Sequence, residues 1–280
     1  MNLVSVSLVI YKNNFNELKR AIESCLNSSL VGVIYLIDNS PTDSLMVLGE
    51  IDSERIVYLF QNKNLGFGKA HNIGINLSLK KKFIYHIILN PDIYFESNVI
   101  EILYEKAITD LSIGLLAPKI IYPNGETQFL CKLIPRPLDL FVRRFMPFRE
   151  VKKRIDNRYE LKFFNYSEEA LIPILSGCFM FVKSSVLKEV NGFDEQFFMY
   201  LEDVDLSRRI GELSKTIYYP YAEVIHKYEK GSYKNKKLLI YHIKSGVRYF
   251  NKWGWFFDKK SDINVNLLHT RLGIIDLEKR

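Results

Sequence analysis

Three acidic residues stand within four positions in the second half of the chain. Glu202, Asp203 and Asp205 follow an aromatic-rich run at 197–200. Acidic residues in the first turn of a helix are favoured by its dipole, which is a purely structural role. A carboxylate beside aromatic side chains also suits a general base next to a sugar-binding wall. We expect removal from water to raise the pKa of a carboxyl group placed there.

A second candidate is the tripeptide Asn90-Pro91-Asp92, which comes directly after an apolar run at 83–89. A hard divalent cation that carries a diphosphate is usually held by one or two carboxylates together with phosphate oxygens. The sequence is equally compatible with an ordinary β-turn. We expect Asp92 at the end of a strand in either case.

Glycines are concentrated in the segment QNKNLGFGKAHNIGIN, residues 61–76. Gly66, Gly68 and Gly74 allow the backbone to approach a ligand closely. A dinucleotide-binding fingerprint is poorly matched, because His71 occupies the place of its third glycine and the segment follows the third strand rather than the first. By itself this segment is also compatible with a plain glycine turn that opens a helix.

The elements that must position these residues alternate between strand and helix. Strands are predicted at 3–11, 33–37, 55–60, 83–89 and 113–121, and helices after Asn14 and Ser97 and at 69–81. Continuous apolar strands separated by helices predict an α/β fold, a mostly parallel sheet with helices on both faces. Ligands of such sheets bind outside the carboxyl ends of the strands, which here carry Asp38, the segment 62–68 and Asp92.

The second half is less regular. A turn is predicted at 122–125, strands at 176–182 and 216–219, and a helix at 201–213. A last helix is predicted at 238–253, with one apolar stripe formed by Leu239, Ile243, Val247 and Phe250.

Composition indicates an ordinary globular protein. Of the 280 residues, 48% are hydrophobic and 25% charged, which excludes a disordered chain, a collagen-like fibre and a coiled coil. The amino-terminal segment predicts a buried strand rather than a signal peptide. No apolar run is long enough to span a bilayer. The three distant cysteines form no CxxC pair and fit a reducing cytoplasm.

The net charge of +7 is unevenly distributed. Residues 226–260 carry ten basic and two acidic residues, and residues 143–162 carry eight basic and three acidic ones. This asymmetry favours an anionic ligand or surface as partner, with solvated helix faces as the alternative. Apolar and aromatic residues accompany the carboxy-terminal charges, at Ile240, Tyr241, Tyr249, Phe250, Trp253, Trp255, Phe256 and Phe257. We expect this segment to bind an anionic membrane surface peripherally.

In combination, these motifs resemble family 2 glycosyltransferases. The resemblance extends over residues 3–226 and rests on the order SLVIYKNN, IDNSPTD, NLGFGKAHNIGI, ILNPDIYF, SGCFMFVK and NGFDEQFFMYLEDVDLSRRI, followed by His226. It is greatest to the rhamnosyltransferase branch of the family. The resemblance implies a GT-A fold in residues 1–225, with a nucleotide-sugar-binding half at 1–121, an acceptor half at 122–225, and a basic helical segment at 226–280.

The resemblance also implies roles for single residues. Asp203 of the Glu202-Asp203 pair matches the general base, and Asp92 matches the metal ligand of the DxD motif, whose first acidic residue is here Asn90. His226 matches a histidine near the metal or diphosphate, although a structural histidine at a strand end is an alternative. Nucleotide-sugar contacts are implied for Tyr11, Asn13, Asp38, Asn64, Gly66, Asn72 and Asn90.

The reaction implied is inverting sugar transfer that depends on Mg²⁺ or Mn²⁺. The donor implied is dTDP-L-rhamnose, with UDP-galactose, UDP-glucose or UDP-GalNAc as the alternative. The acceptor would be a polyprenyl-diphosphate-linked or growing glycan of a cell-surface polysaccharide such as O-antigen or capsule. The enzyme would act in the cytoplasm on the inner face of the membrane.

Two other classes of protein remain open at this stage. One is a basic peripheral membrane or nucleic-acid-binding protein without activity, although nucleic-acid-binding signatures are absent from the sequence. The other is a carbohydrate-binding relative that has lost catalysis, against which the presence of Asp92, Asp203 and His226 argues. Metal-dependent hydrolysis of a nucleotide sugar would distinguish an enzyme from both.

Overall fold

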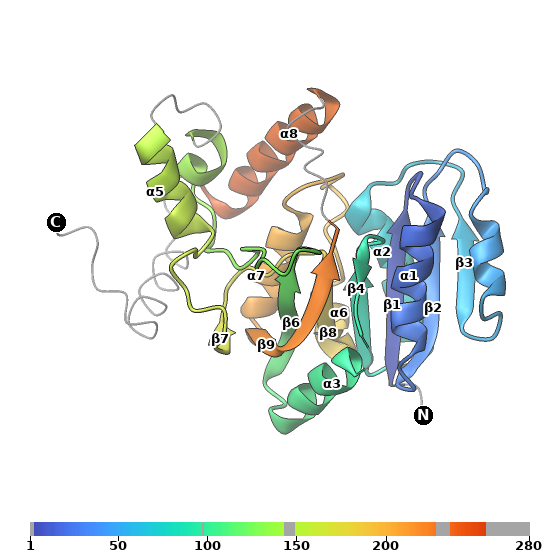
Figure 1. The fold of residues 1–280 in the computed structure, drawn as a ribbon. Helices are drawn as coiled ribbons and strands as arrows, with labels where there is room; N and C mark the ends of the chain where they lie inside the picture. Colours follow the sequence, from blue (N-terminus) through green and yellow to red (C-terminus); the bar gives the residue numbers. More distant parts are fainter. Residues whose placement is uncertain (1–2, 97, 143–148, 228–235, 256–280) are drawn as a thin grey trace.

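The computed structural model describes residues 3–96, 98–142, 149–227 and 236–255 (Figure 1). The strands are β1 (Val4–Ile10), β2 (Val31–Asp38), β3 (Ile56–Phe60), β4 (Tyr85–Leu89), β5 (Ile93–Tyr94), β6 (Ile113–Ile121), β7 (Ala170–Leu171), β8 (Phe179–Lys183) and β9 (Lys215–His226). The helices are α1 (Phe15–Leu26), α2 (Phe67–Lys80), α3 (Val99–Thr109), α5 (Arg149–Tyr159), α6 (Ser184–Glu189), α7 (Glu202–Gly211) and α8 (Lys236–Trp253), with short helices η1 (Met46–Glu50) and η2 (Leu138–Val142).

One sheet runs through the molecule in the order β3-β2-β1-β4-β8-β6-β9-β5, and β7 pairs with β9. The pairs among β3, β2, β1 and β4 are parallel, and so is the pair β6–β9. Strand β8 lies antiparallel between β4 and β6. The predicted α/β class is confirmed, and β8, which comes from the predicted acceptor half, stands between two strands of the predicted nucleotide-sugar-binding half.

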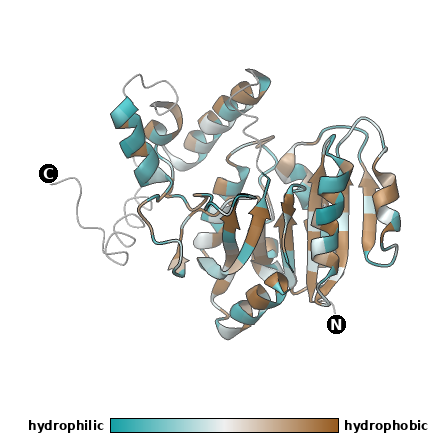
Figure 2. Cartoon of the chain, in the orientation of Figure 1, coloured by the Kyte–Doolittle hydropathy of each residue, from teal (hydrophilic) through white to brown (hydrophobic). Residues whose placement is uncertain are grey.

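Helices cover both faces of the sheet, as predicted (Figure 1). Side chains alternate along β2, so that Ile34 and Leu36 pack with Leu18 and Ile22 of α1 on one face. Val33, Tyr35 and Ile37 pack on the other face with Ala70 of α2. The buried strands are accordingly mostly hydrophobic in Figure 2, and α5 is mostly hydrophilic.

The start of α1 is fixed by a local signal. The Asn14 side chain accepts hydrogen bonds from the backbone N–H groups of Asn16 and Glu17, at 2.9 and 3.3 Å. This confirms Asn14 as the amino-terminal cap. Ser97, predicted to cap α3, lies outside the described residues, and the residue that precedes α3 is Asn98 in a left-handed conformation.

The predicted stripe of α8 is wrong in part. Phe250 is buried, but Ile243 and Val247 are 36% and 38% exposed. The buried face instead includes Ser245 and Tyr249, because α8 packs on polar groups of α7 and of the loop before it. Ile240, Ile243 and Val247 therefore form an exposed apolar ridge.

No helix within the described residues is long and apolar enough to cross a bilayer. All three cysteines are buried and free of disulfides. The predicted turn at 122–125 is present, with the Gly125 N–H donating to the carbonyl of Tyr122.

Candidate active site

Asp92 and His226 are brought together by the short strand β5. The pairing of β5 with β9 places Ile93 opposite His226, and the N–H of Lys227 donates to the carbonyl of Asp92. Asp92 Oδ2 lies 3.3 Å from His226 Nε2. His226 Nδ1 lies 2.9 Å from Gln128 Oε1, and Gln128 Nε2 donates to the carbonyl of His226. Gln128 therefore fixes the orientation of the imidazole.

Asp203 is held at the start of α7 by two backbone N–H groups. Gly177 N donates to its Oδ2 at 3.0 Å and Val204 N to its Oδ1 at 2.9 Å. A Cβ at Gly177 would lie 2.9 Å from the Cβ of Asp203, so only glycine allows this approach. The carboxylate is thus oriented by the turn that precedes β8.

The neighbouring Glu202 has a different environment. Its side chain is buried, and its Oε2 has no hydrogen-bond partner. Burial, and secondarily the charge of Asp203, raises the pKa of Glu202 well above its ordinary value. Its environment therefore favours the protonated form of Glu202.

The turn at Gly177 and Cys178, just before β8, is bound both by Asp203 and by the end of β4. Asn90 N donates to the carbonyl of Cys178 at 2.8 Å, which links the strand end of β4 to this turn. Burial raises the pKa of the Cys178 thiol to about 12, and the charges of Asp92 and Asp203 both contribute to that rise. Asp203 and the Asn90-Pro91-Asp92 turn, more than a hundred positions apart in the sequence, are thus linked through one backbone segment at the carboxyl end of β4.

The glycine segment lies beside the same loop as Asp203. Gly66 has φ +84°, a conformation that favours glycine, and a Cβ there would lie 2.2 Å from the carbonyl oxygen of Phe198. Asn64 Oδ1 accepts from Gly66 N at 2.9 Å, and Asn39 Nδ2 donates to Gly66 O at 3.1 Å. Close packing against the loop at 197–201 therefore requires glycine at position 66.

Asp38 ends β2, as predicted, but it is completely buried. Its Oδ1 accepts from Ser40 N at 2.8 Å and its Oδ2 from the Tyr58 hydroxyl at 2.5 Å. Burial and the Asp38 hydrogen bond raise the pKa of Tyr58. Tyr11 and Asn13 lie at the end of β1, where Asn13 Oδ1 accepts from Tyr11 N and 48% of Tyr11 is exposed. Tyr11 is therefore accessible to a ligand, whereas both oxygens of Asp38 are occupied by protein groups.

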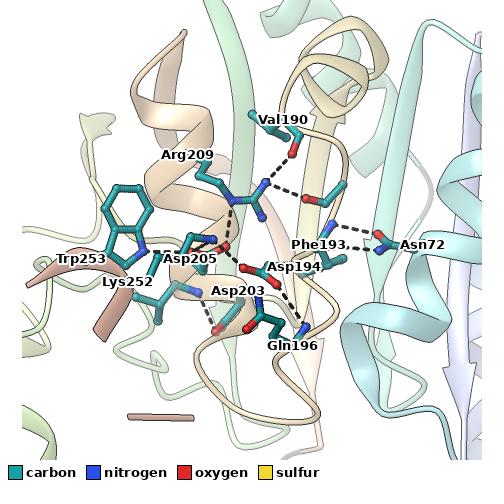
Figure 3. Close-up of polar contacts among 12 residues, drawn as sticks. Asn72, Val190, Phe193, Asp194, Gln196, Asp203, Asp205, Arg209, Lys252 and Trp253 are labelled. Carbon is teal, nitrogen blue, oxygen red and sulfur yellow. Dashed lines mark hydrogen bonds and ion pairs between the residues drawn. The ribbon is translucent and has the colours of Figure 1, made fainter. Parts of the chain in front are cut away.

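Two residues singled out in the sequence are bound by protein groups other than Asp203 (Figure 3). Asn72 Oδ1 accepts from Phe193 N at 2.8 Å and Asn72 Nδ2 donates to Phe193 O at 2.9 Å, so its amide clamps the segment before the loop. Asp205 is completely buried and pairs with Arg209 and Lys252, each at 2.8 Å. Asp205 therefore belongs to the α7–α8 contact rather than to a carboxylate triad.

Gln128 and Gly177 were not identified from the sequence. Gln128 lies 98 positions from His226 and in no recognisable motif, so no local signal points to it. Gly177 lies at the start of the strand predicted at 176–182, and a glycine next to a cysteine before an apolar run was the available signal.

A divalent metal fits these residues. Asp92 Oδ1 is buried and has no hydrogen-bond partner, which leaves an oxygen ligand available beside His226. Within the described residues no group of three or more His, Cys, Asp and Glu side chains could hold a metal. The two protein ligands would therefore need phosphate oxygens of a bound nucleotide to complete a coordination shell, which suits Mg²⁺ or Mn²⁺.

Similarity to solved structures shows the fold. A GalNAc-T7 structure with UDP, GalNAc and Mn²⁺ matches with a TM-score of 0.63 and 16% identity, over 90% of this chain and 50% of that one. The mannosyltransferase PcManGT from Pyrobaculum calidifontis, in complex with GDP-Man and Mn²⁺, matches with a TM-score of 0.54 and 14% identity, over 88% of this chain and 64% of that one. The fold is therefore GT-A, as the sequence predicted.

Sequence comparison is more specific. The N-acetylglucosaminyl-diphospho-decaprenol L-rhamnosyltransferase of Mycobacterium tuberculosis is 29% identical over 206 residues, which cover 69% of this chain and 66% of that protein, just under two thirds of its length. The rhamnosyltransferase WbbL of Escherichia coli is 25% identical over 194 residues, 66% of this chain and 69% of that protein. Residues 6–190 match the model of a protein family described as Glycosyl transferase family 2. The chain thus belongs to glycosyl transferase family 2.

Proposed function

We propose that this protein transfers a sugar, with inversion, from a nucleotide sugar to a lipid-linked glycan acceptor. The observation that carries the proposal is the turn at Gly177 and Cys178, which binds both Asp203 and the end of β4 that leads to Asp92, with the glycine segment packed on the loop before Asp203. A metal-binding carboxylate next to a base is the minimum that such a displacement needs. Family membership and the two rhamnosyltransferase relatives support the same reaction class.

Asp203 is the general base of this proposal. The two N–H groups that hold its carboxylate leave it oriented but still able to accept a proton from an acceptor hydroxyl. The deprotonated oxygen attacks the anomeric carbon from the face opposite the diphosphate, which inverts the configuration. Glu202 supports this role, because the burial that raises its pKa favours the form that adds no second negative charge beside Asp203.

Asp92 and His226 would hold the metal, which when bound offsets the charge on the leaving diphosphate. Gln128 keeps the imidazole of His226 turned toward Asp92. Asn90 stands where the DxD motif has its first acidic residue, so the protein would contribute one negative charge fewer to the metal site. The diphosphate then supplies a larger share of the coordination.

The donor is bound at the carboxyl ends of the first strands. We assign direct contacts to Tyr11, Asn13, Asn64, Gly66 and Asn90, and supporting roles to Asp38 and Asn72. Tyr11 is 48% exposed and so accessible to a ligand, whereas the side chains of Asp38 and Asn72 are occupied by protein partners. We propose 1–121 as the nucleotide-sugar half and 122–225 as the acceptor half, although β8 from the second half stands between β4 and β6 of the first.

The acceptor would be reached at an anionic membrane surface on the cytoplasmic side. The apolar ridge of α8, formed by Ile240, Ile243 and Val247, is flanked by the exposed Lys244 and Arg248. The basic helix α5 lies at the same end of the molecule (Figure 1). Tyr249 and Phe250, counted in the sequence as membrane contacts, are buried and are removed from that set, and Phe256 and Phe257 lie outside the described residues.

A donor panel tests the reaction. Purified protein with a polyprenyl-diphosphate glycan is offered dTDP-L-rhamnose, UDP-galactose, UDP-glucose and UDP-GalNAc, and products are detected by mass spectrometry. We expect transfer from dTDP-L-rhamnose, in line with the relatives. Transfer from only one of the UDP sugars would change the assigned donor and leave the assigned reaction in place. If no donor is either transferred or hydrolysed, the proposed function is contradicted.

A further inference from the structure

The loop at 197–201, which leads into the catalytic helix α7, has an unusual backbone. Tyr200 and Leu201 both adopt left-handed conformations, with φ of 70° and 65°. Residues other than glycine rarely adopt this backbone conformation, and two such residues in succession keep it only where surrounding contacts hold them. Leu201 precedes α7 and makes no side-chain cap, so these contacts must come from elsewhere.

One side of the loop is held by the donor segment. Phe67 N, in the first turn of α2, donates to the carbonyl of Phe198 at 3.0 Å. Gly66 lies against the same carbonyl, with no room for a Cβ. The loop before Asp203 is thus in direct contact with the segment proposed to bind the nucleotide sugar.

The opposite side is held by α8. Ser245 Oγ donates to the carbonyl of Met199 at 2.8 Å, and Ser245 is only 3% exposed. The ring of Tyr241 lies 4.7 Å from that of Phe198, and the ring of His242 lies 5.3 Å from that of Tyr200. Successive carbonyls of the loop, at 198 and 199, are therefore bound from two different helices.

Helix α8 is itself anchored on α7 (Figure 3). Trp253 Nε1 donates to Asp205 Oδ1 at 2.9 Å, and Lys252 joins Asp205 to Asp194 with contacts of 2.8 and 2.7 Å. The Arg208 guanidinium lies 3.9 Å from the centre of the Trp253 ring. Because Asp205 is completely buried, this contact fixes where Ser245 meets the loop.

We infer that Ser245 is a positioning residue for sugar transfer: through the carbonyl of Met199 it holds Tyr200 and Leu201 in their left-handed conformations and so aims Asp203 at the donor. This role rests on the proposed function. Ser245 itself lies in α8, outside residues 1–225, which are proposed to form the catalytic domain. Without the hydroxyl, the loop keeps its contact with Phe67 and loses the opposing one. The donor site is then unchanged, and the base at the start of α7 is misplaced.

The test compares Ser245→Ala with Ser245→Thr and with the control Ser214→Ala. Ser214 also donates to a backbone carbonyl, that of Ile210 at 3.1 Å, but far from the loop. We expect Ser245→Ala to lower kcat about tenfold or more, with the calorimetric Kd for the donor unchanged, because misplacing a reacting group lowers the rate without weakening binding. Ser245→Thr keeps the hydroxyl and restores kcat, and Ser214→Ala leaves kcat unchanged.

Hydrogen exchange of the segment 199–205 separates this inference from the proposed reaction. Faster exchange there in Ser245→Ala, with the rest of the chain unchanged, is the expected result whether or not a donor has been found. Unchanged exchange in 199–205, or a kcat within twofold of the wild type, overturns the positioning role. An equal loss of melting temperature in Ser245→Ala and Ser245→Thr, without the split between kcat and Kd, also overturns it. Absence of transfer by the wild type would refute the reaction alone.

Discussion

Neighbouring carboxyl groups at the start of α7 differ in environment, and that difference assigns their roles. Glu202 is buried with an unpaired oxygen and a raised pKa, whereas Asp203 accepts two backbone hydrogen bonds. The sequence alone identifies this pair of carboxyl groups but not which of them is buried. That depends on how α7 packs and on the turn at Gly177, which lies against Asp203.

Replacing Asp203 by Asn should abolish transfer and spare donor binding. Asn has the shape of Asp but cannot take a proton, and a general base contributes about 10²–10⁴-fold. Turnover of the lipid-linked acceptor and calorimetry with the donor measure the two effects. Asp110→Asn, which removes an exposed ion pair with Lys215, is the control. A variant at position 203 with more than about a tenth of the wild-type kcat would refute the assignment.

Removal of the metal should stop the reaction, and Asp92→Ala should weaken donor binding. Asp92 offers a buried oxygen without a partner beside His226, and a cation held there would link these residues to the diphosphate of a donor. Calorimetry of the donor with and without Mg²⁺ or Mn²⁺, before and after EDTA treatment, measures the dependence. Equal affinity in all conditions would show that no metal mediates donor binding.

At the scale of elements, periodicity predicted the strands and helices of the first half well. Apolar runs that are buried on both faces leave few alternatives to β1, β2 and β4. Periodicity failed for α8, because the surface that this helix meets is charged. The buried Tyr249 hydroxyl accepts a hydrogen bond from Arg208, and the buried Ser245 hydroxyl donates one to a loop carbonyl. A hydrophobic pattern cannot predict such polar partners. The short strand β5 and the contact of Gln128 with His226 depend equally on residues distant in sequence.

The exposed ridge of α8 should bind anionic vesicles. Each basic residue near such a surface contributes about 1 kcal/mol, and the apolar side chains add partial insertion. In liposome flotation we expect wild-type protein to float with anionic vesicles at low salt and to be released at high salt. Replacing Lys237 and Lys244 by Gln, or Ile243 by Asp, should reduce flotation while turnover of a short water-soluble acceptor is kept. Failure of the wild type to float at any salt concentration would refute the membrane role.

At the scale of the whole molecule, a buried polar network joins β1 to its neighbours. Ser7 Oγ lies 2.7 Å from His71 Nδ1 and 2.8 Å from His86 Nε2, and Ser5 Oγ lies 2.8 Å from His86 Nδ1. Burial lowers the pKa of His86 to about 3 and lowers that of His71 well below its ordinary value. Both imidazoles are therefore neutral in the folded protein and can be protonated in the unfolded chain.

Stability should fall as the pH drops below about 6.5, the ordinary histidine pKa. Each histidine that only the unfolded chain protonates costs about 1.4 kcal/mol per pH unit in that range, down to its folded pKa. Glu202 acts in the opposite direction between pH 6 and 5, because the folded protein keeps a proton that the unfolded chain releases. Glu202 therefore offsets part of the histidine slope.

Urea denaturation between pH 6 and 5 measures this slope. We expect Glu202→Gln to steepen the slope, because it removes the opposing group, and His86→Gln to flatten it. A free energy of unfolding of Glu202→Gln that does not change over this range would show that the buried imidazoles are not neutral.

The position of β8 also sets the order in which the chain can fold. When a ribosome has released only the first 121 residues, β4 has an unpaired edge and β6 has no neighbour, because β8 must stand between them. An open strand edge is a template for association with other chains. The sheet can be completed only after β8 and β9 are synthesised, long after β4. Pairing between strands so distant in the sequence slows folding. The nascent amino-terminal half is thus the stage of synthesis most in need of a chaperone, and a split of this protein at residue 121 would not yield two independent units.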